Sequence, residues 1–168
     1  MFQRIVCFLI LIITLFSGAI FLVTSQKVEQ YSFPYKEISL GGSLTRVIEI
    51  MGQPISQEKH TADHILEELA GKNIDVYKLI YKKVSFLVVF EENQLPYINS
   101  ISIRDPNYRL PQNIGIGTRK SKILRVFGDP INSQSEKLFY VNYELRNEIE
   151  FTITNNTVSQ IQLTLFND

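Results

Sequence analysis

The stretch that decides the fold occurs twice, first as ISLGGSLTRVIEIMGQPI at residues 38–55 and again as IGIGTRKSKILRVFGDPI at residues 114–131. The two copies align without a gap at an offset of 76 residues. Ser43 and Thr118 stand where a hydroxyl can accept the first free N–H groups of a helix. Apolar residues then recur at helical spacing, followed by a glycine suited to a left-handed end and a proline that stops the helix. Each copy therefore predicts one short, capped helix.

After each predicted helix, the chain is rich in β-branched and aromatic residues, which favour strands. Ile149, Phe151 and Ile153 alternate with polar residues, which is typical of strands in a sheet with one solvent-exposed face. Each copy is therefore predicted to form a helix followed by a three-stranded antiparallel meander. The predicted strands span residues 76–81, 84–90 and 98–103 after the first helix, and 138–143, 148–153 and 158–163 after the second.

These patterns predict an α+β fold of two tandem helix-plus-antiparallel-meander repeats, with a hydrophobic helix in front. The expected parts are an N-terminal segment at residues 1–25, a first repeat at 36–105 and a second repeat at 112–168. A helical pattern at about residues 58–71 has no counterpart in the second repeat. We therefore expect an additional helix there.

The N-terminal segment determines the compartment. Arg4 is the only charged residue among residues 1–25, and it precedes 19 largely apolar residues at positions 5–23. As a helix these would reach roughly 28 Å, close to the thickness of a bilayer core. They can also form a signal peptide cut between Ser25 and Gln26. We expect a domain that faces outward, either anchored in the cell membrane through residues 5–23 or secreted or periplasmic after cleavage.

The composition excludes several classes of protein. The 168 residues contain 17 Lys and Arg against 17 Asp and Glu, with a pI of about 6.7, so we expect no nucleic-acid partner. The one cysteine, Cys7, excludes a disulfide scaffold and a multi-cysteine zinc site. No Gly-x-Ser-x-Gly nucleophile motif occurs. We expect no cofactor, no metal and no enzymatic activity.

The capped helix from Gly117 to Pro130, together with the strand at 158–161, resembles the SmpA/OmlA (BamE-like) family. The tandem arrangement resembles the two-repeat architecture of β-lactamase-inhibitor proteins. The resemblance implies helices on one side of a curved antiparallel sheet. It also implies a non-enzymatic protein of the cell envelope that binds another protein, in the manner of outer-membrane assembly factors or secreted inhibitors.

Tyrosines on the first predicted strand of each repeat are the candidate binding residues. Tyr77 and Tyr81 belong to the first repeat, and Tyr140 and Tyr143 to the second. Tyrosine is frequent at binding surfaces because it offers a large contact area for little loss of conformational entropy. We therefore expect a protein partner in the cell envelope to contact these side chains on the sheet.

Two alternatives remain open from the sequence. His60 and His64 lie four residues apart and can share a helix face, so a small metal-dependent hydrolase built on them is one alternative. Zinc would need a third ligand from the nearby carboxylates. The other alternative is a domain that senses a peptide or small ligand held between the repeats, which requires an apolar cavity.

A basic run follows the glycines of the second copy. The seven residues 119–125 of the predicted helix include four cations, Arg119, Lys120, Lys122 and Arg125. The glycines before it superficially resemble a phosphate loop, but the spacing and the Lys-Ser/Thr end of that motif are missing. We therefore expect these four cations to form the solvated face of the helix.

Overall fold

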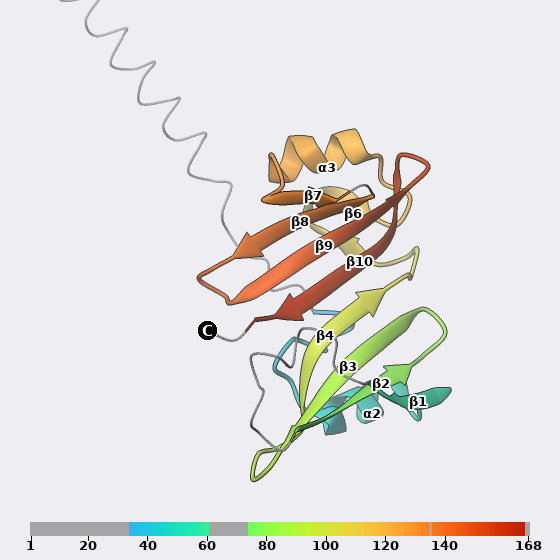
Figure 1. Ribbon diagram of the computed structural model, residues 1–168. Coiled ribbons are helices and arrows are strands. Elements are labelled where there is room, and N and C mark those ends of the chain that lie inside the picture. The colour runs from blue at the N-terminus through green and yellow to red at the C-terminus, as the bar shows by residue number, and fades with distance from the viewer. Residues whose placement is uncertain (1–33, 61–73, 135, 167–168) are drawn as a thin grey trace, which may run out of the picture.

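Strands dominate the structure. The computed structural model describes residues 34–60, 74–134 and 136–166. Within them lie two α-helices, α2 (Leu44–Met51) and α3 (Lys120–Phe127), and the short 3-10 helix η2 (Pro111–Asn113) (Figure 1). The strands are β1 (Ser56–Lys59), β2 (Ile74–Ile80), β3 (Val84–Glu91), β4 (Tyr97–Ile103), β5 (Arg109–Leu110), β6 (Ile114–Gly115), β7 (Asn132–Gln134), β8 (Lys137–Asn142), β9 (Asn147–Thr154) and β10 (Thr157–Leu165).

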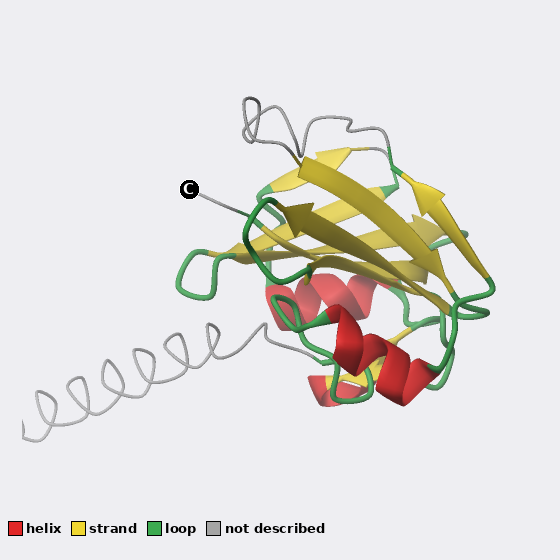
Figure 2. Ribbon diagram, turned by 90° about the horizontal axis from the view of Figure 1, so that it is seen from below, coloured by secondary structure: helices red, strands yellow, loops and turns green. Residues whose placement is uncertain are grey.

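Eight of these strands form one continuous antiparallel sheet in the order β1-β2-β3-β4-β10-β9-β8-β7. At its centre β4 pairs with β10, which places Ile101 opposite Leu163 and Ile103 opposite Ile161. Strands β5 and β6 form a separate two-stranded pair. Figure 2 shows that α2 and α3 lie on the same side of the large sheet.

The expected fold of two tandem helix-plus-meander repeats is wrong. The chain is mostly β, with one eight-stranded sheet rather than a meander for each repeat. The β4–β10 pairing joins strands that the sequence assigned to separate units, and their buried side chains share one core. The edge strands β1 and β7 were not predicted, because their sequences, SQEK and NSQ, are polar and fully exposed.

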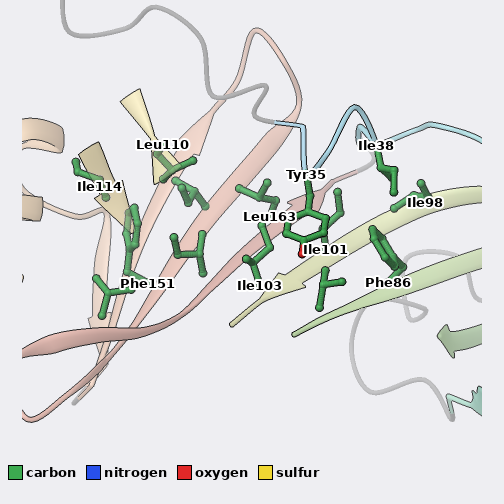
Figure 3. Packing of buried hydrophobic residues seen from close by; sticks show 14 of the residues in the cluster. Tyr35, Ile38, Phe86, Ile98, Ile101, Ile103, Leu110, Ile114, Phe151 and Leu163 are labelled. Atoms are coloured by element: carbon green, nitrogen blue, oxygen red, sulfur yellow. The ribbon is translucent and has the colours of Figure 1, made fainter. Parts of the chain in front are cut away.

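The core lies on one face of the sheet (Figure 3), and buried residues of both helices belong to the same cluster, so this is the face that the helices cover. Successive residues of a strand point to opposite faces, and on the covered face Phe86, Phe151 and Leu163 are at most 1% exposed. Each helix adds one fully buried residue, Val47 from α2 and Ile123 from α3. The amphipathic helices therefore bury one stripe each and leave their charged residues in water.

The two helices begin differently. Ser43 caps α2 as predicted, and its hydroxyl accepts the Arg46 N–H at 3.3 Å. Thr118 does not cap α3, because its hydroxyl instead accepts the N–H of Gly115 at 3.0 Å within the preceding turn. The chain thus uses this hydroxyl to close the turn that leads into α3.

The two helices end alike. Gly52 and Gly128 follow them with φ of 73° and 81°, and each N–H donates to the carbonyl four residues earlier. Their ψ values of −161° and −157° lie outside the left-handed helical region that the sequence predicted. This combination of φ and ψ is essentially restricted to glycine, so glycine is still required at both positions.

Two predicted elements lie outside the described residues. These are the N-terminal segment at 1–25 and most of the additional helix, since residues 61–73 are not described. Strand β1 takes up the start of the range predicted for that helix. Within the described part of the chain, no helix is both long and apolar enough to cross a membrane. The limits 36–105 and 112–168 of the expected units stay predictions.

Candidate functional site

The structure separates the four predicted binding tyrosines. Tyr81 and Tyr140 are 9% and 4% exposed and lie on the helix-covered face of the sheet. The Tyr81 hydroxyl donates to the carbonyl of Gly52 at 2.9 Å, and the Tyr140 hydroxyl donates to the carbonyl of Gly128 at 3.1 Å. Both tyrosines therefore hold the end of a helix on the sheet, where a partner cannot reach their rings.

Replacing either hydroxyl tests this role. We expect Tyr81→Phe and Tyr140→Phe each to lower the free energy of unfolding by about 0.5–1.5 kcal/mol, because each removes one hydrogen bond and keeps the ring. Urea denaturation followed by circular dichroism measures the change. Tyr143→Phe serves as the control, since among the described residues no hydrogen bond of that hydroxyl links a helix to the sheet. An equal loss in all three variants would contradict the assignment.

Tyr77 and Tyr143 lie in different surroundings. Tyr77 is half-buried and packs edge-on against Phe90, with the ring centroids 5.3 Å apart. Tyr143 is 74% exposed, just beyond the end of β8, and its ring lies 6.2 Å from that of Phe166. Leu145, in the same turn, is 39% exposed. We name Tyr143, Leu145 and Phe166 the Tyr143 patch.

The turn that carries the Tyr143 patch is fixed by hydrogen bonds. The buried Asn142 side chain accepts the N–H groups of Glu144 and Leu145 at 3.0 and 3.1 Å. The Phe166 N–H donates to the carbonyl of Arg146 at 3.1 Å, which holds the chain after β10 beside the turn. The patch therefore presents its apolar side chains from an ordered backbone, which lowers the entropy cost of binding.

The two histidines are not brought together within the described residues. His60 follows β1 as a half-buried residue, and its backbone N–H donates to the Val76 carbonyl at 2.8 Å. His64 lies outside the described residues. Among the residues that are described, no group of three or more His, Cys, Asp or Glu side chains could hold a metal ion. The hydrolase alternative stays a prediction.

A pair of carboxylates lies on the sheet face opposite the helices. Glu148 and Glu150 alternate with the core residues of β9. Glu150 is 6% exposed and lies 3.1 Å from Lys137 Nζ. Burial raises the pKa of Glu148 and the charge of Glu150 raises it further, while Lys137 lowers it. A cationic group of a partner placed here would favour the ionised form of Glu148.

A cationic pocket of about 470 Å³ lies beside α3. Arg109 reaches it from β5, and Arg119, Lys122 and Arg125 line it from the start and flank of α3. A Cβ atom on Gly115 would lie 2.5 Å from Arg109 Nη1, so glycine there leaves room for that guanidinium. The remaining lining residues are Asn113, Ile116, Gly117, Thr118 and Ser121.

The cationic pocket includes more than the expected solvated helix face. No pattern in the sequence places Arg109, ten residues before Arg119, in the same cluster. The short pairing of β5 with β6 brings it there, because Arg109 lies opposite Gly115. A sequence signal was present only in the run of cations on α3, whose charges no acidic residue interrupts.

Neither a protein-family model nor a curated protein matches the chain. Among solved structures, the chain is similar to an extracellular protein containing a SCP domain from Bacillus anthracis str. Ames, with a TM-score of 0.43 and 8% sequence identity. The alignment covers 82% of this chain and 47% of that protein, so the chain spans about half of its length. At this level of similarity, function has to be inferred from the chain's own residues.

The resemblance to the SmpA/OmlA family and to β-lactamase-inhibitor proteins is wrong. No family model matches the chain, and the strands form one eight-stranded sheet instead of two repeats. The motif that suggested the family consists of helix caps, helix breakers and core residues. Those residues are needed wherever a short helix packs on a sheet, so they do not identify a family.

Proposed function

We propose that this chain is an extracytoplasmic, non-enzymatic module that binds a protein partner of the cell envelope through the Tyr143 patch. The observation that carries the proposal is the position of Tyr143, 74% exposed on a turn fixed by Asn142. Exposed aromatic residues on ordered backbone are typical centres of protein interfaces.

The chemistry of the patch favours a protein partner over a small molecule. Tyr143 and Phe166 meet edge to face, at an interplanar angle of 74°, and the exposed Leu145 extends this apolar surface within the same turn. Small-molecule sites are concave, whereas protein interfaces combine aromatic anchors with a polar rim. Glu144 and Arg146, which flank Leu145 in the same turn, can supply that rim.

The outward location is the second part of the proposal. It is supported by the 19 largely apolar residues at positions 5–23, which follow Arg4 and can serve as a signal peptide or an anchor. N-terminal sequencing of the native protein distinguishes the two, because cleavage would leave Gln26 as the first residue.

Truncating Tyr143 tests the binding surface. We expect Tyr143→Ala to weaken partner binding by about 30-fold, which corresponds to about 2 kcal/mol for an aromatic anchor. Affinity capture from detergent-solubilised membranes of the source cells, with the tagged full-length chain as bait, identifies envelope proteins that the wild type enriches. Titration of the purified partner then measures the affinity of each variant.

Leu95→Ala is the matched control for this experiment. Leu95 is 85% exposed in the loop between β3 and β4, so its truncation removes exposed apolar surface from a different hairpin. The partner should be retained by Leu95→Ala and lost by Tyr143→Ala. Equal enrichment by the wild type and by Tyr143→Ala would contradict the proposed surface.

A further inference from the structure

The segments that lead into α2 and α3 have the same local structure at an offset of 76 residues. Each begins with two residues at positive φ, Lys36 and Glu37 before α2 and Gln112 and Asn113 before α3. A glycine at positive φ follows in each segment, and its N–H donates to a strand of the sheet at 2.8 Å in both cases. The side chains of the two segments can therefore be compared position by position.

On α2 the basic side chain is neutralised. Arg46 Nη2 lies 2.7 Å from Glu37 in the preceding turn, and Arg46 Nη1 lies 3.3 Å from Glu49 on the next turn of the helix. Exposed ion pairs of this kind add little to stability. They do cancel the charge of Arg46, so this flank of α2 has no excess charge to offer an anion.

On α3 the corresponding positions carry no carboxylate. Lys122 takes the place of Arg46, and the two positions that hold glutamates around Arg46 hold Asn113 and Arg125. Lys122 Nζ donates to the main-chain carbonyl of Asn113 at 3.3 Å, which leaves its charge uncompensated. Among the described residues, no carboxylate forms an ion pair with Lys122, Arg125 or the neighbouring Arg119.

We propose that the cationic pocket binds a small phosphorylated ligand, with its phosphate between Arg119, Lys122 and Arg125. A guanidinium group can donate two parallel hydrogen bonds to two oxygens of one phosphate, and an ammonium group adds a point charge. The hydroxyl of Ser121, which lines the same pocket, can add a further donor. The volume of about 470 Å³ lies within the range of small-molecule sites.

The number of cations favours phosphate over a single carboxylate. Arg109 brings the pocket to four positive side chains. A carboxylate would neutralise one of them, whereas a phosphate monoester carries about two charges near neutral pH and has three terminal oxygen acceptors. The site rests on these side chains along the flank of the helix and does not depend on the helix N-terminus.

Calorimetric titration of the full chain with inorganic phosphate tests the proposal. We expect saturable binding that weakens with added salt, because the ion pairs between phosphate and the side chains of this pocket would be exposed to solvent. Arg125→Glu restores the charge pattern found on α2, since the new carboxylate would lie one turn from Lys122. We expect this variant to bind phosphate at least tenfold more weakly than the wild type, with an unchanged circular dichroism spectrum.

Lys120→Gln is the matched control, because Lys120 belongs to the same helix but does not line the pocket. It removes one positive charge, and we expect it to change the phosphate affinity by less than twofold. Tyr143→Ala should also leave phosphate binding unchanged, which separates this site from the proposed protein surface. Absence of saturable binding, or an equal loss in Lys120→Gln and Arg125→Glu, would overturn the proposal.

Soluble probes distinguish the sources of the phosphate. Glycerol 3-phosphate represents a free phosphate monoester, and glycerophosphoglycerol represents the phosphodiester headgroup of an anionic lipid. Tighter binding of the first assigns the pocket to a soluble metabolite, and tighter binding of the second assigns it to a lipid headgroup. Citrate is the competing chemistry, and its binding in place of all three phosphates would contradict the inference.

Discussion

Phe151→Ala is expected to lower the free energy of unfolding by about 3–5 kcal/mol, the cost of a large cavity in a packed core. Phe151 is fully buried in β9, and its ring lies 5.2 Å from Phe127 of α3 and 6.0 Å from Tyr140 of β8. The side chain thus joins a helix to two strands. Truncation leaves aromatic rings on two sides, and these cannot collapse into the space without moving the helix.

Urea denaturation measures this loss, and Phe139→Ala is the matched control. Phe139 lies on the adjacent strand β8, where it is half-buried on the opposite face of the sheet, near Lys137. Its truncation should cost about 1–2 kcal/mol, because less apolar area is lost and no closed cavity forms. Equal losses in the two variants would mean that the main core does not lie on the helix-covered face.

Local structure could be predicted from the sequence because its signals are local. The helix ends follow from the glycines at 52 and 128, and the six predicted strand ranges overlap β2, β3, β4, β8, β9 and β10. The union of the strands into one sheet could not be predicted. The β4–β10 pairing joins Ile103 to Ile161, and nothing in either strand specifies a partner so far along the chain.

The binding site could not be predicted in full because the sequence does not show which face of the sheet each tyrosine lies on. Tyr81 lies two residues from the buried Leu79, so strand alternation places both on one face. Alternation leaves open whether that face meets helices or solvent. Tyr143 differs because it follows the end of β8, where the turn closed by Asn142 directs it outward.

Asp105 lies two residues beyond the end of β4 and is not among the residues that the sequence singled out. It is 8% exposed, and its carboxylate accepts three hydrogen bonds. The donors are the Tyr35 hydroxyl at 3.1 Å, the Asn107 N–H at 3.1 Å and Lys83 Nζ at 3.3 Å. Tyr35 is 2% exposed and packs against Phe86, so this contact connects residues 34–38 to the core.

Asp105→Ala should lower the free energy of unfolding by about 1–3 kcal/mol, because it leaves the buried Tyr35 hydroxyl without an acceptor. Tyr35→Phe removes the hydroxyl itself and should cost less. In the double variant the two losses should not add, because the second change no longer breaks a bond. Additive losses in urea denaturation would contradict a direct contact between Tyr35 and Asp105.

The same contact predicts how stability depends on pH. The Asn107 N–H bond, followed by the bonds from Tyr35 and Lys83, holds the pKa of Asp105 below its usual 3.8 despite partial desolvation. A carboxyl whose pKa is lower in the folded state stabilises the fold fully above the unfolded-state pKa, and this contribution disappears as the pH falls through the folded-state pKa. The stability difference between the wild type and Asp105→Asn should therefore be constant near neutral pH and shrink below about pH 4.

The opposite end of the pH range provides an independent check, because burial and then the bond to Asp105 raise the pKa of Tyr35 to about 12. A hydroxyl whose pKa is higher in the folded state contributes fully below its ordinary value of 10 and loses that contribution as the pH rises toward 12. Wild-type stability should therefore fall above pH 10 more steeply than that of Tyr35→Phe. Parallel curves for the two proteins would show that the Tyr35 hydroxyl is solvated, and the buried contact with Asp105 would then be wrong.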